Sequence, residues 1–225
     1  HHDSPAFALV HDKLGGEEHR LTTHLLDPGV VSEGLLDECR GGVMMSGTLF
    51  PPQMYYDLLK VPKSRVSIVK EYTSHFLSER RPVLIAKDVT SRYAERGEEN
   101  TARIRAHIHS VLRQTPGHVA VFAPSYALLE QIVLEDEDWV VRSRQLLEER
   151  SGASKEQMDS MVDRLHQLRR SKTPALLAGV LGGKLAEGVD YPGNILDAVI
   201  CIGLPLPPPS ARQDALREYY EDEYD

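Results

Sequence analysis

Two short apolar runs enclose a glycine-rich polar loop, and this arrangement constrains the fold more than any other feature of the chain. The first run is Ala175–Val180 and the second is Ala198–Leu204, and neither contains a charged side chain. Continuous apolar runs bounded by turn residues are typical of strands that are buried on both faces of a parallel sheet. The loop at 182–193 would then follow the carboxyl end of a strand, which is where open α/β sheets bind ligands.

This loop departs from the P-loop that binds nucleotide phosphates. A P-loop requires Gly, four residues, Gly-Lys and then a Ser or Thr that holds Mg²⁺. Here Leu185 follows Lys184, and Ala178 stands at the first glycine position. Lys184 could still meet a phosphate as a point charge, but the metal-holding hydroxyl is missing. A strand–turn–helix connection whose glycines only relieve crowding is the alternative.

The overall charge of the chain argues against a general affinity for nucleic acid. The 225 residues carry a formal net charge of −8 and are 41% hydrophobic. A contact with DNA or RNA must therefore come from a local groove. No run approaches the ~20 apolar residues of a membrane span. There is no signal peptide, so we expect a cytoplasmic protein without a membrane partner.

The two cysteines, Cys39 and Cys201, lie far apart and lack the spacing of a metal site. We therefore expect no metal ligands in this chain. Cys201 falls in the second apolar run, and we expect it to be a reduced thiol in the core.

Apolar periodicity and capping residues predict the remaining elements. The alternation of strand and helix from residue 83 onward predicts an α/β fold, with a parallel sheet covered by helices on both faces. Asn100 is expected to cap a helix that ends near Gln114, and Ser154 to open another with a capping box. Further strands are expected at 43–45, 66–69, 83–86, 118–123 and 139–141, and further helices at 53–59, after residue 126 and from 210 to about 221.

Polar residues at two other places suit contacts with phosphates or bases. Ser125 and Tyr126 follow the strand expected at 118–123, where they could present a hydroxyl and a helix N-terminus to a phosphate. The alternative is that Ser125 is a plain N-cap. Arg92 lies in a polar loop with a second arginine and a tyrosine, which could bind phosphate and a base face. The alternative is a solvated, salt-bridged loop.

Four blocks of sequence, in this order, resemble the C-terminal motor region of XPD/DinG-type superfamily 2 DNA helicases, especially archaeal XPD-like proteins. The blocks are Met45–Pro51, Val121–Tyr126, Gly182–Gly193 and Ile202–Pro205. The similarity covers nearly the whole chain from about Leu26. It implies that 1–60 form the end of a first RecA-like domain, including the Ser-Gly-Thr-Leu turn. Residues 61–225 would form a second RecA-like domain that is truncated before motif VI.

The resemblance also implies roles for individual residues. Residues 46–48 resemble motif III, Ser125 and Tyr126 resemble motif IV, and the loop from Gly182 to Asp190 resembles motif V. By this resemblance the catalytic residues would be Thr48, Glu187 and Asp190, and the nucleotide would lie near Glu187, Gly188 and Asp190. The nucleic-acid contacts would be Gly183, Lys184, Ser125 and Tyr126. Arg92 is a further candidate because of the polar loop in which it lies.

The function implied by the resemblance is that of a motor-domain fragment. The full protein would be an ATP-dependent DNA helicase that moves 5′ to 3′ on single-stranded DNA, with a role in DNA repair. ATP and Mg²⁺ would be bound mainly by the first RecA-like domain, which would also be the partner of this chain. An iron–sulfur cluster is possible in the full protein but not in this chain.

Several motifs of an active motor are missing from the sequence. The chain has no Walker A sequence, no DEAH-like box and no motif VI. Because phosphoryl transfer depends on positioning and charge neutralisation by such residues, we expect no ATP hydrolysis by this chain alone. The alternative is a non-catalytic RecA-like module that binds single-stranded nucleic acid or a partner protein.

Overall fold

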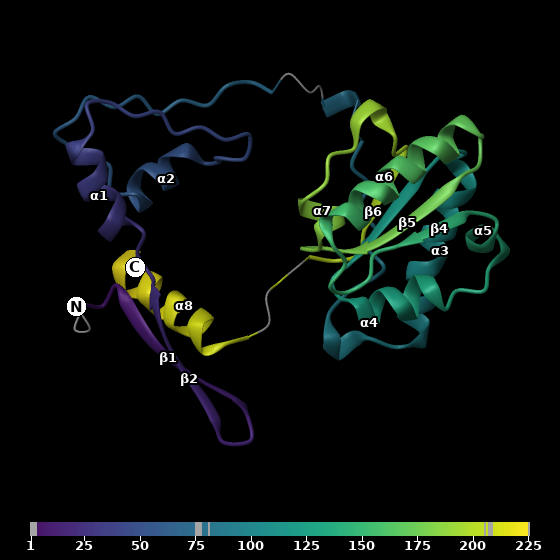
Figure 1. Ribbon diagram of the computed structural model, residues 1–225, viewed down its shortest axis with the longest axis horizontal. Coiled ribbons are helices and arrows are strands. Elements are labelled where there is room, and N and C mark those ends of the chain that lie inside the picture. The colour runs from purple at the N-terminus through teal and green to yellow at the C-terminus, as the bar shows by residue number, and fades with distance from the viewer. Residues whose placement is uncertain (1–3, 75–77, 81, 205, 207–208, 225) are drawn as a thin grey trace. The chain divides into compact units, whose positions relative to one another are not determined.

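The computed structural model describes residues 4–74, 78–80, 82–204, 206 and 209–224, and the chain divides into two compact units (Figure 1). Unit 1 comprises His1–Pro82 together with Pro208–Asp225, and unit 2 comprises Val83–Pro207. The second unit thus begins at Val83 rather than near residue 61, and the last helix is grouped with unit 1. The assignment of the two units to two RecA-like domains stays a prediction.

Unit 2 is built on a four-stranded parallel sheet. Its strands are β3 (Val119–Ala123), β4 (Gln145–Glu148), β5 (Ala175–Val180) and β6 (Ala198–Cys201), and their order is β4-β5-β3-β6. The two apolar runs that flank the glycine-rich loop are therefore both strands, and β3 lies between them. The strands β3, β5 and β6 were predicted from their apolar runs, because a buried parallel strand needs apolar side chains on both faces.

Helices cover both faces of this sheet (Figure 1). Alternate residues of β5 point to opposite faces, so Leu176 and Ala178 belong to one core cluster, whereas Ala175 and Leu177 belong to the other. The predicted fold class is confirmed. The first cluster is covered by α3 (Glu98–Gln114), α4 (Tyr126–Leu129), the π-helical turn η3 (Glu130–Leu134) and α5 (Trp139–Arg142), and the second by α6 (Lys155–Arg170) and α7 (Lys184–Glu187).

The capping box predicted at the start of α6 is present in full. The Ser154 hydroxyl accepts a hydrogen bond from the Gln157 N–H at 3.3 Å, and the Gln157 side chain accepts one from the Ser154 N–H at 2.7 Å. The helix then buries Met158 and Leu165 completely against the sheet. Local capping and apolar periodicity agree here, which is why the sequence predicts this helix well.

The cap predicted for α3 is wrong. The helix begins at Glu98, and its N-cap residue is Gly97, three positions before Asn100. The buried Asn100 amide instead accepts a hydrogen bond from the Thr90 N–H at 3.0 Å and donates one to the Thr90 carbonyl at 2.8 Å. Asn100 therefore fixes the preceding loop to the helix.

Four of the predicted strands are not formed. Residues 43–45, 66–69 and 83–86 are exposed and lie outside any strand, because no strand among the described residues pairs with them. Residues 139–141 form the turn α5, since the Asp138 carboxylate accepts the Val140 N–H at 2.8 Å and begins a helix. Cys201 is exposed rather than buried, because β6 is an edge strand whose alternate residues face outward.

The described residues of unit 1 form an antiparallel hairpin and several helices. Its elements are β1 (Phe7–Gly15), β2 (Glu18–Leu25), α1 (Gly29–Glu38), α2 (Pro52–Leu58) and α8 (Ala211–Tyr224), with the short turn η1 (Ser78–Arg80). Gly16 has a φ of +57° in the hairpin turn, a conformation that suits glycine. Both α2 and α8 were predicted from the sequence.

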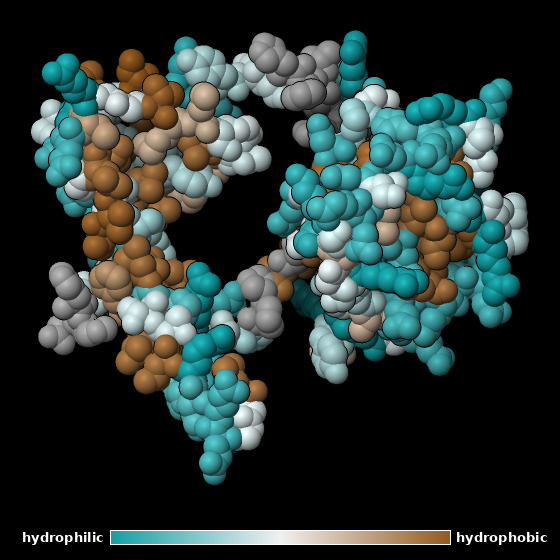
Figure 2. Space-filling view, in the orientation of Figure 1, coloured by the Kyte–Doolittle hydropathy of each residue, from teal (hydrophilic) through white to brown (hydrophobic). Residues whose placement is uncertain are grey.

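Unit 1 buries few apolar side chains. Among its described residues, only Ala6, Val10 and Leu26 are buried and apolar. Figure 2 shows large apolar side chains gathered on the surface of this unit. Leu21 of the hairpin, for example, is 67% exposed. Unit 2 presents mainly hydrophilic side chains in the same view. Among the described helices, none combines the length and apolar character needed to cross a membrane.

Candidate functional site at the carboxyl edge of the sheet

The carboxyl ends of the four parallel strands of unit 2 meet at one edge of the sheet. Ser125 follows β3 by two residues, Gly183 and Lys184 follow β5, and Gly203 follows β6. Glu149 follows β4 on the same edge. The fold therefore brings the predicted motif IV and motif V residues to the ligand-binding edge of an α/β sheet.

The turn after β5 has a defined geometry. Gly182 has a φ of +78°, which favours glycine, and it leads through Gly183 into the single helical turn α7. Leu185 is fully buried and anchors α7 to the core. The Tyr191 hydroxyl donates a 2.7 Å hydrogen bond to the Leu185 carbonyl, and burial together with the Glu149 charge raises the pKa of Tyr191 to about 12. The buried Leu185 side chain and the hydrogen bond from Tyr191 therefore both fix the position of this turn.

Glu149 is a functional candidate that the sequence analysis missed. Its side chain is only 3% exposed, and its carboxylate accepts the Lys184 N–H at 2.8 Å and the Val180 N–H at 3.3 Å. The one available signal is a carboxylate directly after a strand of an α/β sheet. That signal was hidden because β4, with the sequence Gln-Leu-Leu-Glu, was not predicted as a strand.

The predicted ligand residues of motif V differ in their surroundings. The Lys184 ammonium donates a 2.6 Å hydrogen bond to the Ala153 carbonyl, and its side chain lies at the surface. Glu187, Gly188 and Asp190 are exposed. The Glu187 and Asp190 carboxylates make no hydrogen bond or ion pair with another described residue, so both are accessible as acceptors.

The motif IV residues occupy the start of α4. The Ser125 hydroxyl accepts the Leu128 N–H at 3.3 Å, so Ser125 is an N-cap, as the simpler interpretation predicts. Tyr126 begins the helix and is 37% exposed. Burial and the nearby Glu149 charge raise the pKa of the Tyr126 hydroxyl, so the phenol stays protonated at neutral pH. The residue remains partly accessible at the carboxyl edge.

The loop that carries Arg92 reaches the same edge. A Cβ atom on Gly203 would lie 2.1 Å from the Ser91 hydroxyl, which shows how closely this loop packs against the end of β6. Asn100 fixes the loop through Thr90, as described above. The Arg92 side chain is 82% exposed and pairs with Glu95 at 3.5 Å. The structure shows the salt-bridged loop, and the binding of a phosphate or a base by Arg92 stays a prediction.

Thr48 lies in unit 1, in the segment between α1 and α2. Its N–H donates a 3.2 Å hydrogen bond to the Ser46 hydroxyl, and the two hydroxyl oxygens are also 3.2 Å apart. This local network makes Ser46–Thr48 a compact polar turn. The other predicted site residues belong to unit 2.

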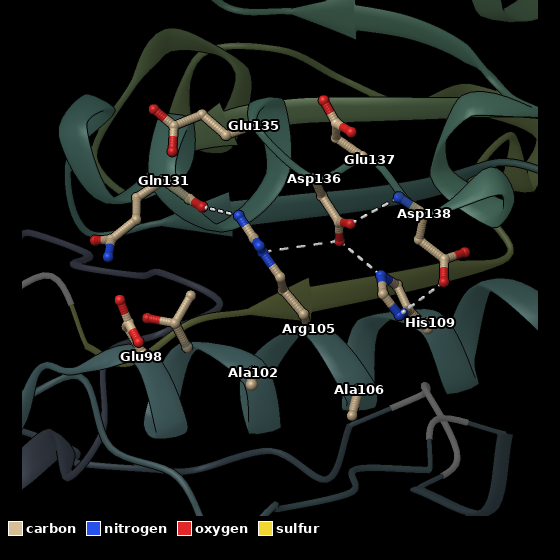
Figure 3. A pocket seen from close by; sticks show the side chains of 11 residues that line it. Glu98, Ala102, Arg105, Ala106, His109, Gln131, Glu135, Asp136, Glu137 and Asp138 are labelled. Atoms are coloured by element: carbon tan, nitrogen blue, oxygen red, sulfur yellow. Dashed lines mark hydrogen bonds and ion pairs between the residues drawn. The ribbon is translucent and has the colours of Figure 1, made fainter.

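A separate pocket lies between α3 and the segment from Gln131 to Asp138, with a volume of about 710 Å³ (Figure 3). Arg105 and His109 point from α3 toward this segment, and His109 lies 2.6 Å from Asp136. None of the predicted site residues lines the pocket. Its lining includes five carboxylates, Glu98, Glu135, Asp136, Glu137 and Asp138, and so disfavours a polyanion.

Comparisons with known proteins identify the family and the fold of this chain. The model of the "Helicase C-terminal domain" family matches residues 108–225, which is just over half of the chain. A solved XPD helicase structure matches with a TM-score of 0.57 at 21% identity, over 90% of this chain and 34% of that one, which shows the same fold.

Curated relatives are named ATP-dependent DNA helicases. The protein CHL1 of Scheffersomyces stipitis is 27% identical over 196 residues, and chl-1 of Caenorhabditis elegans is 24% identical over 195. Each alignment covers 81% of this chain and 23% of the relative. The chain thus spans about a quarter of the length of the curated relatives it matches. On these matches the chain belongs to the helicase C-terminal domain family, and the resemblance to XPD/DinG-type DNA helicases is confirmed.

Proposed function

We propose that this chain is part of an ATP-dependent DNA helicase, to which it contributes a surface for single-stranded DNA and one side of a nucleotide site. The observation that carries the proposal is the convergence of Ser125, Tyr126 and the Gly182–Gly188 turn at one sheet edge, in a chain of this family. The named relatives support a DNA substrate and the use of ATP.

The DNA contacts would come from cationic and aromatic side chains. Lys184 and Arg92 would bind backbone phosphates, and both side chains are exposed. The exposed Tyr126 would offer its ring to a base and its hydroxyl to a phosphate. Ser125 and Gly183 would contribute backbone close to the strand. These contacts would be local, as the net charge of −8 requires.

The nucleotide contacts would come from Glu187, Gly188 and Asp190, with Thr48 coupling the nucleotide state to DNA. The exposed carboxylates fit this role chemically, because they can accept ribose hydroxyls or orient an arginine. Bound ATP would supply the phosphoryl group whose transfer drives movement. Mg²⁺ would be held mainly by the first RecA-like domain. Among the described residues, no group of three or more His, Cys, Asp or Glu side chains is placed to hold a metal ion.

Fluorescence anisotropy of labelled single-stranded DNA, titrated with this chain at several salt concentrations, tests the DNA surface. We expect a micromolar-range affinity that falls steeply between about 50 mM and about 200 mM salt. A duplex of the same sequence is the matched control and should bind more weakly, because its bases cannot reach Tyr126. The absence of binding at low salt would overturn the assignment of a DNA surface to this chain.

A further inference from the structure

A buried carboxylate lies under the candidate DNA-binding turn. Glu149 accepts the Lys184 N–H through one carboxylate oxygen at 2.8 Å and the Val180 N–H through the other at 3.3 Å. It makes no ion pair with a described cation. A carboxylate that is buried without a cation needs such charge-assisted hydrogen bonds, because burial otherwise disfavours its charge.

Two glycines make this approach possible. A Cβ atom on Gly183 would lie 2.6 and 2.7 Å from the two Glu149 carboxylate oxygens. A Cβ atom on Gly179 would lie 2.8 Å from one of them. Cβ atoms essentially never approach other heavy atoms this closely. Because positions 179 and 183 are glycines, the Glu149 carboxylate fits beside the backbone at both positions.

The Lys184 N–H is the first amide of α7, the group that would face a phosphate in a phosphate-binding loop. Here this amide faces Glu149 instead. The Lys184 ammonium turns to the Ala153 carbonyl at 2.6 Å. The backbone N–H and the ammonium of Lys184 are thus both bound by residues of the connection between β4 and α6, Glu149 and Ala153.

We propose that Glu149 is an internal anion that fills the anion position at the Lys184 and Val180 amides and thereby positions Lys184 for DNA. It is a positioning residue, since a ligand at the turn would meet the Lys184 side chain and not its amide. The part of this inference that concerns DNA rests on the proposed function. The occupation of the anion position by Glu149 does not depend on it.

Thermal unfolding of three variants tests the internal anion. Glu149→Ala leaves two backbone N–H groups without an acceptor and should lower Tm by about 5–10 °C. Acetate at about 0.2 M should refill the vacated position and restore several degrees, relative to chloride at equal ionic strength. Glu149→Gln fills the space, so it should lose stability without responding to acetate. Glu148→Ala, at the neighbouring position, is the control and should do neither.

Amide hydrogen exchange keeps the test decisive if Glu149→Ala does not fold. In Glu149→Gln, exchange at the Lys184 amide should accelerate at least about tenfold relative to wild type, while Glu148→Ala leaves it unchanged. Unchanged exchange in Glu149→Gln would overturn the proposal. An acetate response equal in wild type and Glu149→Ala would also overturn it.

DNA affinity separates this inference from the proposed function. Glu149→Gln should weaken single-stranded DNA binding several-fold if the turn positions Lys184. If wild type binds no DNA but Glu149→Ala recovers with acetate, the proposed function fails and the internal anion stands. If wild type binds DNA and Glu149→Gln binds equally well, the positioning role fails and the proposed function stands.

Discussion

The Tyr219 hydroxyl in α8 donates a 2.9 Å hydrogen bond to the buried carboxylate of Asp27, which lies 192 positions earlier in the chain. Asp27 also accepts the Lys60 ammonium at 2.5 Å and the Gly29 N–H at 2.7 Å. Burial raises the pKa of Asp27, but these hydrogen bonds outweigh it and hold the pKa below its usual value. One carboxylate thus ties three separate segments of unit 1 together.

We predict that Tyr219→Phe destabilises unit 1 by about 1 kcal/mol, because one hydrogen bond to a buried charge is lost. Asp27→Ala should cost about 2–3 kcal/mol, since it removes the shared acceptor of all three donors. Urea unfolding measures both effects. Tyr93→Phe, at an exposed tyrosine of unit 2, is the matched control. Equal midpoints for Tyr219→Phe and wild type would show that α8 does not depend on this bond.

A buried histidine predicts how the stability of unit 2 depends on pH. His118 Nδ1 accepts the Ala175 N–H at 3.0 Å, so Nε2, 3.0 Å from the Leu165 carbonyl, is the donor and the ring is neutral. Burial lowers the pKa of His118 below 6.5. The unfolded chain therefore binds a proton first as the pH falls below 6.5. Stability from His118 is complete above that pH and is lost as the pH decreases toward the lower, folded-state pKa.

The measurement is the free energy of unfolding of unit 2 between about pH 7.5 and about pH 5.5. It should fall with decreasing pH, with a contribution from His118 no steeper than about 1.4 kcal/mol per pH unit. His118→Gln should remove this contribution at some cost in stability. His166→Gln, on α6, should keep it. A wild-type profile that matches that of His118→Gln would contradict the prediction.

The sequence predicts the sheet well wherever local and tertiary preferences agree. β3, β5 and β6 are apolar runs that are paired, and β3 and β5 are buried along their full length, so the pattern alone identifies them. β4 was missed because an edge strand of four residues needs little apolar character. The strand predicted at 83–86 is wrong for a different reason. It has the composition of a strand, but no strand among the described residues pairs with it.

The candidate site was only partly predictable. Spacing identified the Gly182–Asp190 loop, since glycines and charges after an apolar run have few structural uses. It could not reveal that Gly183 accommodates Glu149, because that contact joins positions 34 apart through the pairing of β4 with β5. The Gly15-Gly16 pair is a hairpin signal between β1 and β2, and it was overlooked.

Charge removal at the sheet edge should change the salt dependence of DNA binding. Lys184→Ala keeps the backbone N–H bound to Glu149 but removes the ammonium, and Arg92→Ala removes an exposed guanidinium. Each should reduce the slope of log affinity against log salt by about 0.7, the value for one phosphate contact on a single strand. Arg142→Ala, beside the acidic pocket, should leave the slope unchanged. An equal slope in all variants would mean that Lys184 and Arg92 are only solvated surface.

In the ATP-dependent helicase of which we propose this chain is part, Asp190→Ala should lower ATP turnover without affecting folding. Asp190 is exposed and has no partner among the described residues, so Tm should stay within about 1 °C of wild type. If its carboxylate contacts the nucleotide or an arginine, turnover should fall at least about tenfold. Asp159→Ala, at an exposed position on α6, is the control for loss of a surface carboxylate. Unchanged turnover would remove Asp190 from the site.

Gly183→Ala should lower the stability of the protein mainly because the added methyl group clashes with the Glu149 carboxylate. In wild type the added Cβ would lie within 2.7 Å of both carboxylate oxygens, so Gly183→Ala should cost about 2–3 kcal/mol. In Glu149→Ala the carboxylate is absent, and the same methyl group should cost at least about 1 kcal/mol less. Urea unfolding of the two single variants and the double variant measures this coupling. Additive losses would show that the strain lies elsewhere, for example against the Val180 side chain at 2.8 Å.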